Sequence, residues 1–163
     1  MKNSDLFFMQ EALLQAKTAK KNGEVPIGAV IVKDNKIIAK GSNRCITDKD
    51  PTAHAEIVAM RKAAKKLKNY RLNNCAIYTT IEPCPMCSGA LINARVKKIL
   101  FGALDKKAGA CRSVFRFANG KKLNHQIEIE KTKGQISEDC AQIIKSFFKE
   151  KRILSDNQKK GEK

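Results

Sequence analysis

The sequence predicts an α/β fold in which a mixed central sheet is flanked by helices. Helical segments alternate with β-branched or apolar runs along the chain, and two of the early runs are close enough to form a hairpin. With 163 residues, 42% of them hydrophobic, the chain can form a domain with a sizeable core. We place a single domain at residues 1–154 and expect a disordered basic tail at 155–163.

A helix and a hairpin are predicted first. Apolar residues at helical spacing follow a possible cap at Ser4, and Asn22-Gly23 ends the pattern. Residues 27–32 are a β-branched run, residues 34–35 a turn, and residues 36–39 a returning strand. The apolar positions of the first helix are Leu6, Met9, Leu13 and Ala16.

The remaining elements alternate. Residues 53–67 predict a helix, because they are rich in Ala, Met, Glu and Lys and follow the helix-start residues Asp50-Pro51-Thr52. A second helix begins near Pro83 and runs to about Asn93, and a last one is capped by Ser137. Strands are expected at residues 76–80, 97–102 and 127–130. The last helix carries an apolar stripe formed by Cys140, Ile143, Ile144, Phe147 and Phe148.

The net charge and the cysteines indicate what kind of partner the chain binds and in which compartment it works. The chain has 33 Lys and Arg against 16 Asp and Glu, a net charge of +17, which favours a polyanionic partner such as nucleic acid over a merely lysine-rich surface. The N-terminus lacks the apolar region of a secretory signal, and no apolar run approaches the ~20 residues of a membrane span. We therefore expect a cytoplasmic protein whose cysteines include metal ligands rather than disulfides.

Two short motifs indicate a metal centre. His54 stands two residues before Glu56, and Cys84 and Cys87 have the spacing of a metal knuckle. One His and two Cys leave one position of a tetrahedral zinc open, as in catalytic sites. The pattern H-x-E…P-C-x-x-C is the signature of zinc nucleobase deaminases, in which the Glu moves protons and is not a ligand. A closed structural knuckle would need two further ligands, for which His125 and four scattered cysteines are the candidates.

The motifs also support a resemblance. Residues 51–56 (Pro-Thr-Ala-His-Ala-Glu) and 82–90 (Glu-Pro-Cys-Pro-Met-Cys-Ser-Gly-Ala) resemble the cytidine and deoxycytidylate deaminase superfamily. Three further segments, residues 24–29, 69–72 and 101–105, narrow the resemblance to the bacterial tRNA-specific adenosine deaminases. It covers roughly residues 6–152 and implies a three-layer cytidine-deaminase-like fold.

The resemblance implies hydrolytic deamination of adenosine to inosine at the wobble position of a tRNA anticodon, by a homodimer with one zinc per subunit and no nucleotide cofactor. It makes His54, Cys84 and Cys87 the metal ligands and Glu56 the catalytic residue. Asn43 matches the residue that hydrogen-bonds the flipped-out base, although an asparagine here is also compatible with a plain turn. The other implied substrate-binding residues are Pro26, Ile27, Gly28, Ala29, Asp105 (ribose) and Phe148 (loop packing).

Two other functions remain open. The same chemistry could act on a free base or nucleoside such as guanine or cytosine, but a small neutral substrate does not require a charge of +17. A non-catalytic, zinc-stabilised RNA-binding module would not need the Glu56 carboxylate. Residues 112–117 depart from the family pattern, and their interleaved basic and aromatic residues suit RNA stacking.

Overall fold

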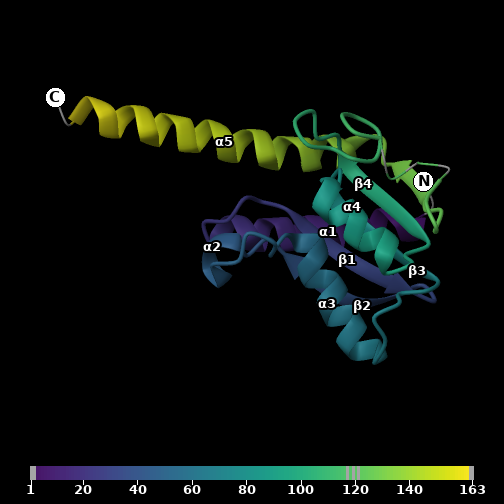
Figure 1. The fold of residues 1–163 in the computed structure, drawn as a ribbon. Coiled ribbons are helices and arrows are strands. Elements are labelled where there is room, and N and C mark those ends of the chain that lie inside the picture. Colours follow the sequence, from purple (N-terminus) through teal and green to yellow (C-terminus); the bar gives the residue numbers. More distant parts are fainter. Residues whose placement is uncertain (1–2, 117, 119, 121, 162–163) are drawn as a thin grey trace.

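A mixed sheet of five strands forms the centre of the fold (Figure 1). The structure is a computed structural model, and it describes residues 3–116, 118, 120 and 122–161. The strand order is β2-β1-β3-β4-β5. Strand β1 pairs antiparallel with β2 and β3, whereas β3, β4 and β5 run parallel. The predicted hairpin and mixed sheet are therefore confirmed. The strands are β1 (Gly28–Lys33), β2 (Lys36–Ser42), β3 (Cys75–Ile81), β4 (Lys98–Ala103) and β5 (Glu128–Lys131).

Helices cover both faces of the sheet and complete the expected three layers. Helix α1 packs with α5 on one face, around a core that includes Met9, Val30 and Leu100. Helices α3 and α4 cover the other face, around Ile31, Ile77 and Phe101. Successive residues of β1 and β4 enter the two cores in turn, as the period of two in a strand requires. The helices are α1 (Asn3–Lys21), α2 (Cys45–Asp48), α3 (Ala55–Leu67), α4 (Pro85–Asn93) and α5 (Gln135–Gly161).

Helix α1 approaches β1 so closely that a glycine is required at the start of the strand. A Cβ on Gly28 would lie 2.1 Å from the carbonyl oxygen of Ala12 and 2.3 Å from the amide nitrogen of Ala16. The backbone amide of Gly28 also donates to the hydroxyl of Thr80, at 3.1 Å. The residue thus fixes how the first helix lies on the sheet.

Helix α5 differs from the prediction at both ends. It begins at Gln135, so Ser137 lies in its first turn, where its hydroxyl donates to the carbonyl of Gly102 at 2.8 Å rather than capping the helix. At the other end the helix continues to Gly161, whereas we expected a disordered tail from residue 155. Residues 151–160 contain no Pro or Gly, so a helix already held by core packing can propagate through them. Residues 162–163 lie outside the described part.

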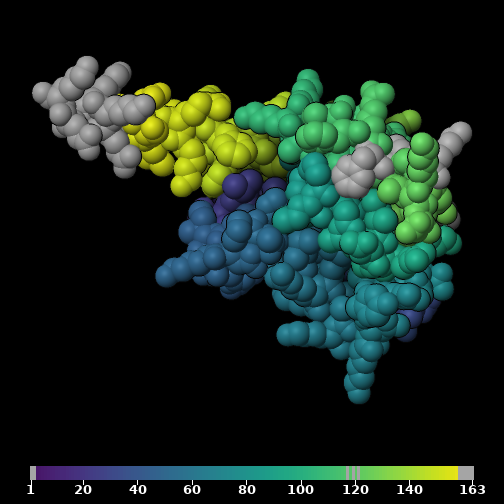
Figure 2. Space-filling model, viewed as in Figure 1, coloured from purple at the N-terminus to yellow at the C-terminus, as the bar shows by residue number. Residues whose placement is uncertain are grey.

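The last turns of α5 project from the body of the molecule, as Figures 1 and 2 show. Phe147 is buried, and Lys20 of α1 still pairs with Glu150 at 2.8 Å. Beyond that ion pair, residues 151–157 are all exposed. Within the described ranges, no helix combines the length and apolar character that a membrane crossing requires.

Candidate metal and catalytic site

Two helix N-termini meet at the candidate metal site. His54 is the N-cap residue of α3 and Cys84 the N-cap residue of α4, and neither side chain makes a capping hydrogen bond. Pro85 fits the first position of α4, since no hydrogen bond is needed from its nitrogen there. Both side chains are therefore free to bind a ligand, and the positive ends of two helix dipoles favour thiolate charge at this point.

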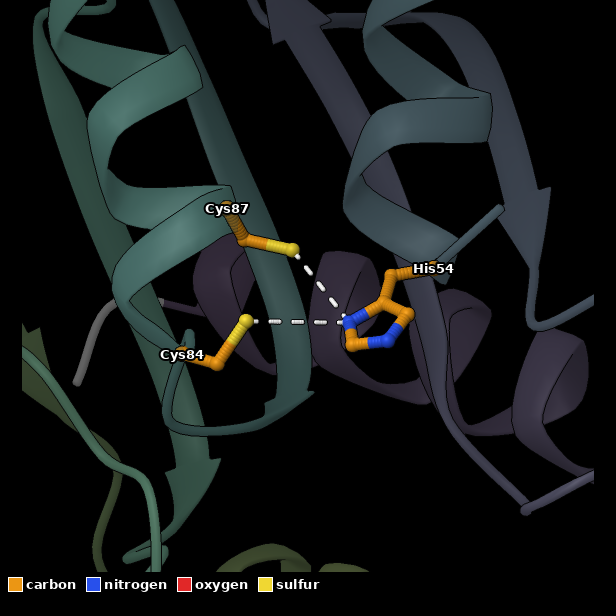
Figure 3. A group of neighbouring side chains, drawn as sticks. All are labelled: His54, Cys84 and Cys87. Atoms are coloured by element: carbon orange, nitrogen blue, oxygen red, sulfur yellow. Dashed lines mark hydrogen bonds between the residues drawn. The ribbon is translucent and has the colours of Figure 1, made fainter. Parts of the chain in front are cut away.

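The three predicted metal ligands lie together. His Nδ1 or Nε2 and the two cysteine sulfurs form a group whose ligand atoms are all within 4.8 Å of one another. Nδ1 of His54 is 3.7 Å from Sγ of Cys84 and 3.6 Å from Sγ of Cys87, and Figure 3 shows both sulfurs directed at that nitrogen. An imidazole nitrogen with two sulfurs is a donor set that suits zinc.

The two thiols have different proton affinities. A hydrogen bond from Cys87 and a contact with His54 lower the pKa of Cys84 to about 4. The same hydrogen bond, together with burial, raises the pKa of Cys87. The hydrogen bond to Cys84 in turn raises the pKa of His54. One thiolate and one thiol thus share a proton beside the imidazole, and a bound cation would displace that proton.

Glu56 lies in the first turn of α3 with only 2% of its surface exposed. Burial raises the pKa of its carboxyl to about 7, near the value at which a group both accepts and releases protons at neutral pH. Its Oε2 atom is buried and makes no hydrogen bond. A buried oxygen without a protein partner is expected where a water or a substrate atom completes the site. The residues present therefore fit a catalytic metal with an adjacent proton carrier.

Backbone contacts bring the loop that carries Asn43 to the segment that precedes His54. The amide of Asn43 donates to the carbonyl of Ile27, and the amide of Arg44 donates to the carbonyl of Ala53, each at 3.0 Å. Asn43 is 5% exposed. The residue before β1, Asn43 and the residue before His54 are thereby held side by side, and the role of Asn43 in base binding stays a prediction.

The other predicted substrate residues are placed as follows. Pro26 is buried, Ile27 half-buried and Ala29 fully buried in the core beneath α3 and α4. The glycine at position 28 is accounted for by its packing against α1. Their contacts with substrate stay predictions.

Asp105 and Phe148 lie farther along the chain. Asp105 follows β4 and is half-buried, and its Oδ1 accepts the amides of Lys107 and Ala108 at 2.9 and 3.1 Å. Phe148 is 44% exposed on α5, its ring 5.5 Å from that of Phe147. The roles of both in substrate binding also stay predictions.

Two buried carboxylates near the site were not predicted. Glu82, two residues before Cys84, accepts the amides of Cys111, Arg112 and Ser113 at 2.9, 2.6 and 3.0 Å. Glu24 lies beside Asn43 and is only 1% exposed. Each carboxylate belongs to a segment that carries the family resemblance, but its hydrogen-bond partners lie 19 to 31 residues away in the sequence.

The atypical segment 112–117 is anchored by Glu82 to the residues that precede Cys84. The hydroxyl of Ser113 lies 2.6 Å from Oε2 of Glu82, and the amide of Ala110 donates to the carbonyl of Pro83 at 2.9 Å. Phe115 is 56% exposed, and Phe117 lies outside the described residues. An exposed aromatic ring thus stands on a segment anchored next to the metal ligands.

Comparisons with known proteins show the family of this chain. The profile of the MafB19-like deaminase family matches residues 3–152. A tRNA-specific adenosine deaminase of Haemophilus influenzae is 47% identical over 145 residues, which cover 88% of this chain and 83% of that protein. One of Bacillus subtilis is 40% identical over 148 residues, 91% of each chain. A solved structure from work on A-to-I editing by tRNA:A34 deaminases superimposes with a TM-score of 0.80 at 39% identity, over 85% of this chain and 99% of that one. This chain therefore belongs to the MafB19-like deaminase family and, within it, to the tRNA-specific adenosine deaminases.

Proposed function

We propose that this chain is a zinc-dependent hydrolase that converts adenosine to inosine at the wobble position of a tRNA anticodon and releases ammonia. The observation that carries the proposal is the buried, unpartnered oxygen of Glu56 beside a cluster of one imidazole and two thiols. That arrangement provides a metal ligand set and a separate proton carrier, which hydrolytic deamination needs together. The relatives named as tRNA-specific adenosine deaminases support the choice of substrate.

The residues divide the chemistry between them. When bound by His54, Cys84 and Cys87, zinc would lower the pKa of a water molecule at the site. Glu56 would take one proton from the attacking water and deliver it to a ring nitrogen of adenine. The water oxygen would bond to C6 as the bond from C6 to the amino group breaks, and the second proton would leave with that group as ammonia. The overall reaction consumes one water and yields inosine and ammonia. A carboxyl with a pKa of about 7 suits both steps, since it can hold or release the proton at neutral pH.

The substrate class follows from charge and from access to the pocket. A base can enter only when it is unstacked, and unstacking costs least in an exposed loop. The net charge of +17 would attract the phosphates of an anticodon stem-loop. We assign recognition of the base to Asn43 and the segment formed by Pro26, Ile27, Gly28 and Ala29. Asp105 is proposed to contact a ribose hydroxyl, and Phe148 to pack near the anticodon loop.

A homodimer is part of the proposal. An apolar groove of about 700 Å³ lies between α3 and α4, with Ile57, Met60 and Leu72 in its lining. At its rim Tyr70 is 70% exposed and Met86, which stands between the two cysteine ligands, is 37% exposed. A second copy covering this groove would bury apolar surface directly beside the metal site. Light scattering should give twice the monomer mass, and Tyr70→Glu should shift the protein toward monomer.

The cysteines support action in the reducing cytoplasm. Two of the proposed zinc ligands, Cys84 and Cys87, are cysteines that bind a metal only in their reduced form, which the cytoplasm maintains. We therefore propose a cytoplasmic enzyme that acts on tRNA there.

Substrate competition tests the proposal. The purified protein is incubated with an anticodon stem-loop that has adenosine at the wobble position, and separately with guanine, cytosine and cytidine. We expect inosine in the stem-loop and little turnover of the small molecules, which lack the binding energy of flanking nucleotides. More efficient deamination of guanine or cytosine would establish the small-molecule function instead.

A further inference from the structure

A buried carboxylate without a role in the proposed reaction lies next to Asn43, the proposed base contact. Glu24 follows the end of α1, where Gly23 adopts a positive φ of 75° and the amide of Glu24 donates to the carbonyl of Ala19 at 3.0 Å. This helix end fixes the backbone, so the side chain is directed inward and remains 1% exposed. A carboxylate is costly to bury unless its oxygens are hydrogen-bonded, so its partners show what it does.

The partners of Glu24 come from the loop that carries Asn43. Oε1 accepts the backbone amide of Thr47 at 2.7 Å and the Thr47 hydroxyl at 2.9 Å. Oε2 accepts the side-chain amide of Asn43, with Nδ2 at 3.3 Å. Burial alone would raise the pKa of Glu24, but these hydrogen bonds from Thr47 and Asn43 lower it below its ordinary value. The group is therefore ionised at neutral pH and can only accept hydrogen bonds.

An acceptor-only partner determines which way the Asn43 amide faces. An asparagine side chain can rotate by half a turn and exchange its oxygen with its nitrogen at little cost. Beside an ionised carboxylate this rotation would place Oδ1 against an oxygen, so Nδ2 must face Glu24. The outward side then presents Oδ1 and one N–H, and the contact described for Oδ1 is the weak one from the thiol of Cys45 at 3.8 Å.

We propose that Glu24 is a positioning residue that locks the Asn43 amide in one orientation and thereby sets the hydrogen-bonding pattern offered to the target base. This inference rests on the proposed role of Asn43 as the base contact. The backbone of Asn43 is held independently through the carbonyl of Ile27. Glu24 therefore controls the rotation of the amide group rather than the position of the loop alone.

The variant Glu24→Gln tests this idea with little change in shape. A glutamine can offer either a donor or an acceptor, so it no longer dictates the orientation of Asn43. Glu128→Gln is the matched control, because it makes the same charge change at an exposed position on β5. We expect Glu24→Gln to lower kcat/KM on the stem-loop by about tenfold or more, at unchanged zinc content, and the control to stay within about twofold of the parent.

A double-mutant cycle distinguishes positioning from a general structural effect. If Glu24 acts through the Asn43 amide, Asn43→Ala and the double variant Asn43→Ala/Glu24→Gln should have the same kcat/KM within about twofold. A further loss in the double variant as large as that of Glu24→Gln in the parent would overturn the inference. Parental kcat/KM in Glu24→Gln would overturn it as well.

NMR provides a measurement that does not depend on activity or on folding of a variant. In the ¹⁵N-labelled parent protein, one side-chain amide proton of Asn43 should be shifted downfield and protected from exchange by its bond to the carboxylate. Random-coil chemical shifts and rapid exchange for both protons would overturn the inference. If the parent forms no inosine, the proposed function fails, and the NMR signals still decide whether Glu24 orients Asn43.

Discussion

Replacing Glu82 with Gln should destabilise the protein although the two side chains have nearly the same shape. The carboxylate is 1% exposed, and Oε1 accepts three backbone amides from the segment 111–113. Oε2 accepts the amide of Asp105 at 3.2 Å and lies 2.6 Å from the hydroxyl of Ser113. A glutamine can keep one oxygen among the three amides, but it then turns an NH₂ group toward the Asp105 amide.

The magnitude follows from these contacts. One buried amide left facing a donor costs about 1–3 kcal/mol. The remaining hydrogen bonds lose the assistance of the charge, which roughly halves their contribution. Together these effects should reduce the free energy of unfolding by about 2–4 kcal/mol.

Urea unfolding at equal metal content measures this loss. With a slope of about 2 kcal/mol per molar urea, the midpoint should fall by roughly 1–2 M. Glu128→Gln serves again as the control for charge and should leave the midpoint unchanged. A urea midpoint for Glu82→Gln equal to that of the parent within experimental error would show that the carboxylate does not hold residues 105–113 to the segment that precedes Cys84.

Three further predictions concern the metal, the RNA and pH. Cys87→Ser should reduce zinc content and stability, because metal binding is coupled to folding, and full zinc by elemental analysis would remove Cys87 from the ligand set. Affinity for the stem-loop should fall steeply between ~50 and ~200 mM potassium chloride, and a flat response would contradict binding through phosphates. The lowered pKa of Glu24 means that the unfolded chain binds its proton first as the pH falls. The stabilisation by the Glu24 carboxylate is therefore complete above pH ~4.3, the pKa of an unfolded glutamate, and is lost as the pH falls through the lower pKa of the folded state. Glu24→Gln should consequently lose less stability on acidification than the parent.

The sequence predicts best those features that depend on local pattern. The spacing of His54 and Glu56, and of Cys84 and Cys87, indicated a metal site, and the structure brings the ligands His54, Cys84 and Cys87 together. Helix and strand periods likewise predicted the layered sheet. Boundaries were less accurate: α3 begins at Ala55 with His54 as its N-cap rather than at residue 53, and the short helix α2 was not expected.

What the sequence does not reveal depends on packing across the fold. Nothing local to Glu24 or Glu82 shows that their oxygens meet amides 19 to 31 residues away, because those pairings exist only once the loops are assembled. Gly28 illustrates the opposite problem. It belongs to a segment that resembles a substrate-binding motif, yet the close approach of α1 is sufficient to require a glycine there.

A single-turnover comparison of the parent with Glu56→Gln, on a stem-loop with adenosine at the wobble position, tests the central claim most directly. Glutamine retains the size of Glu56 but cannot carry the proton. We predict that Glu56→Gln keeps its zinc and its RNA affinity while inosine formation nearly disappears. A rate within about tenfold of the parent would show that another group moves the proton and would contradict the account.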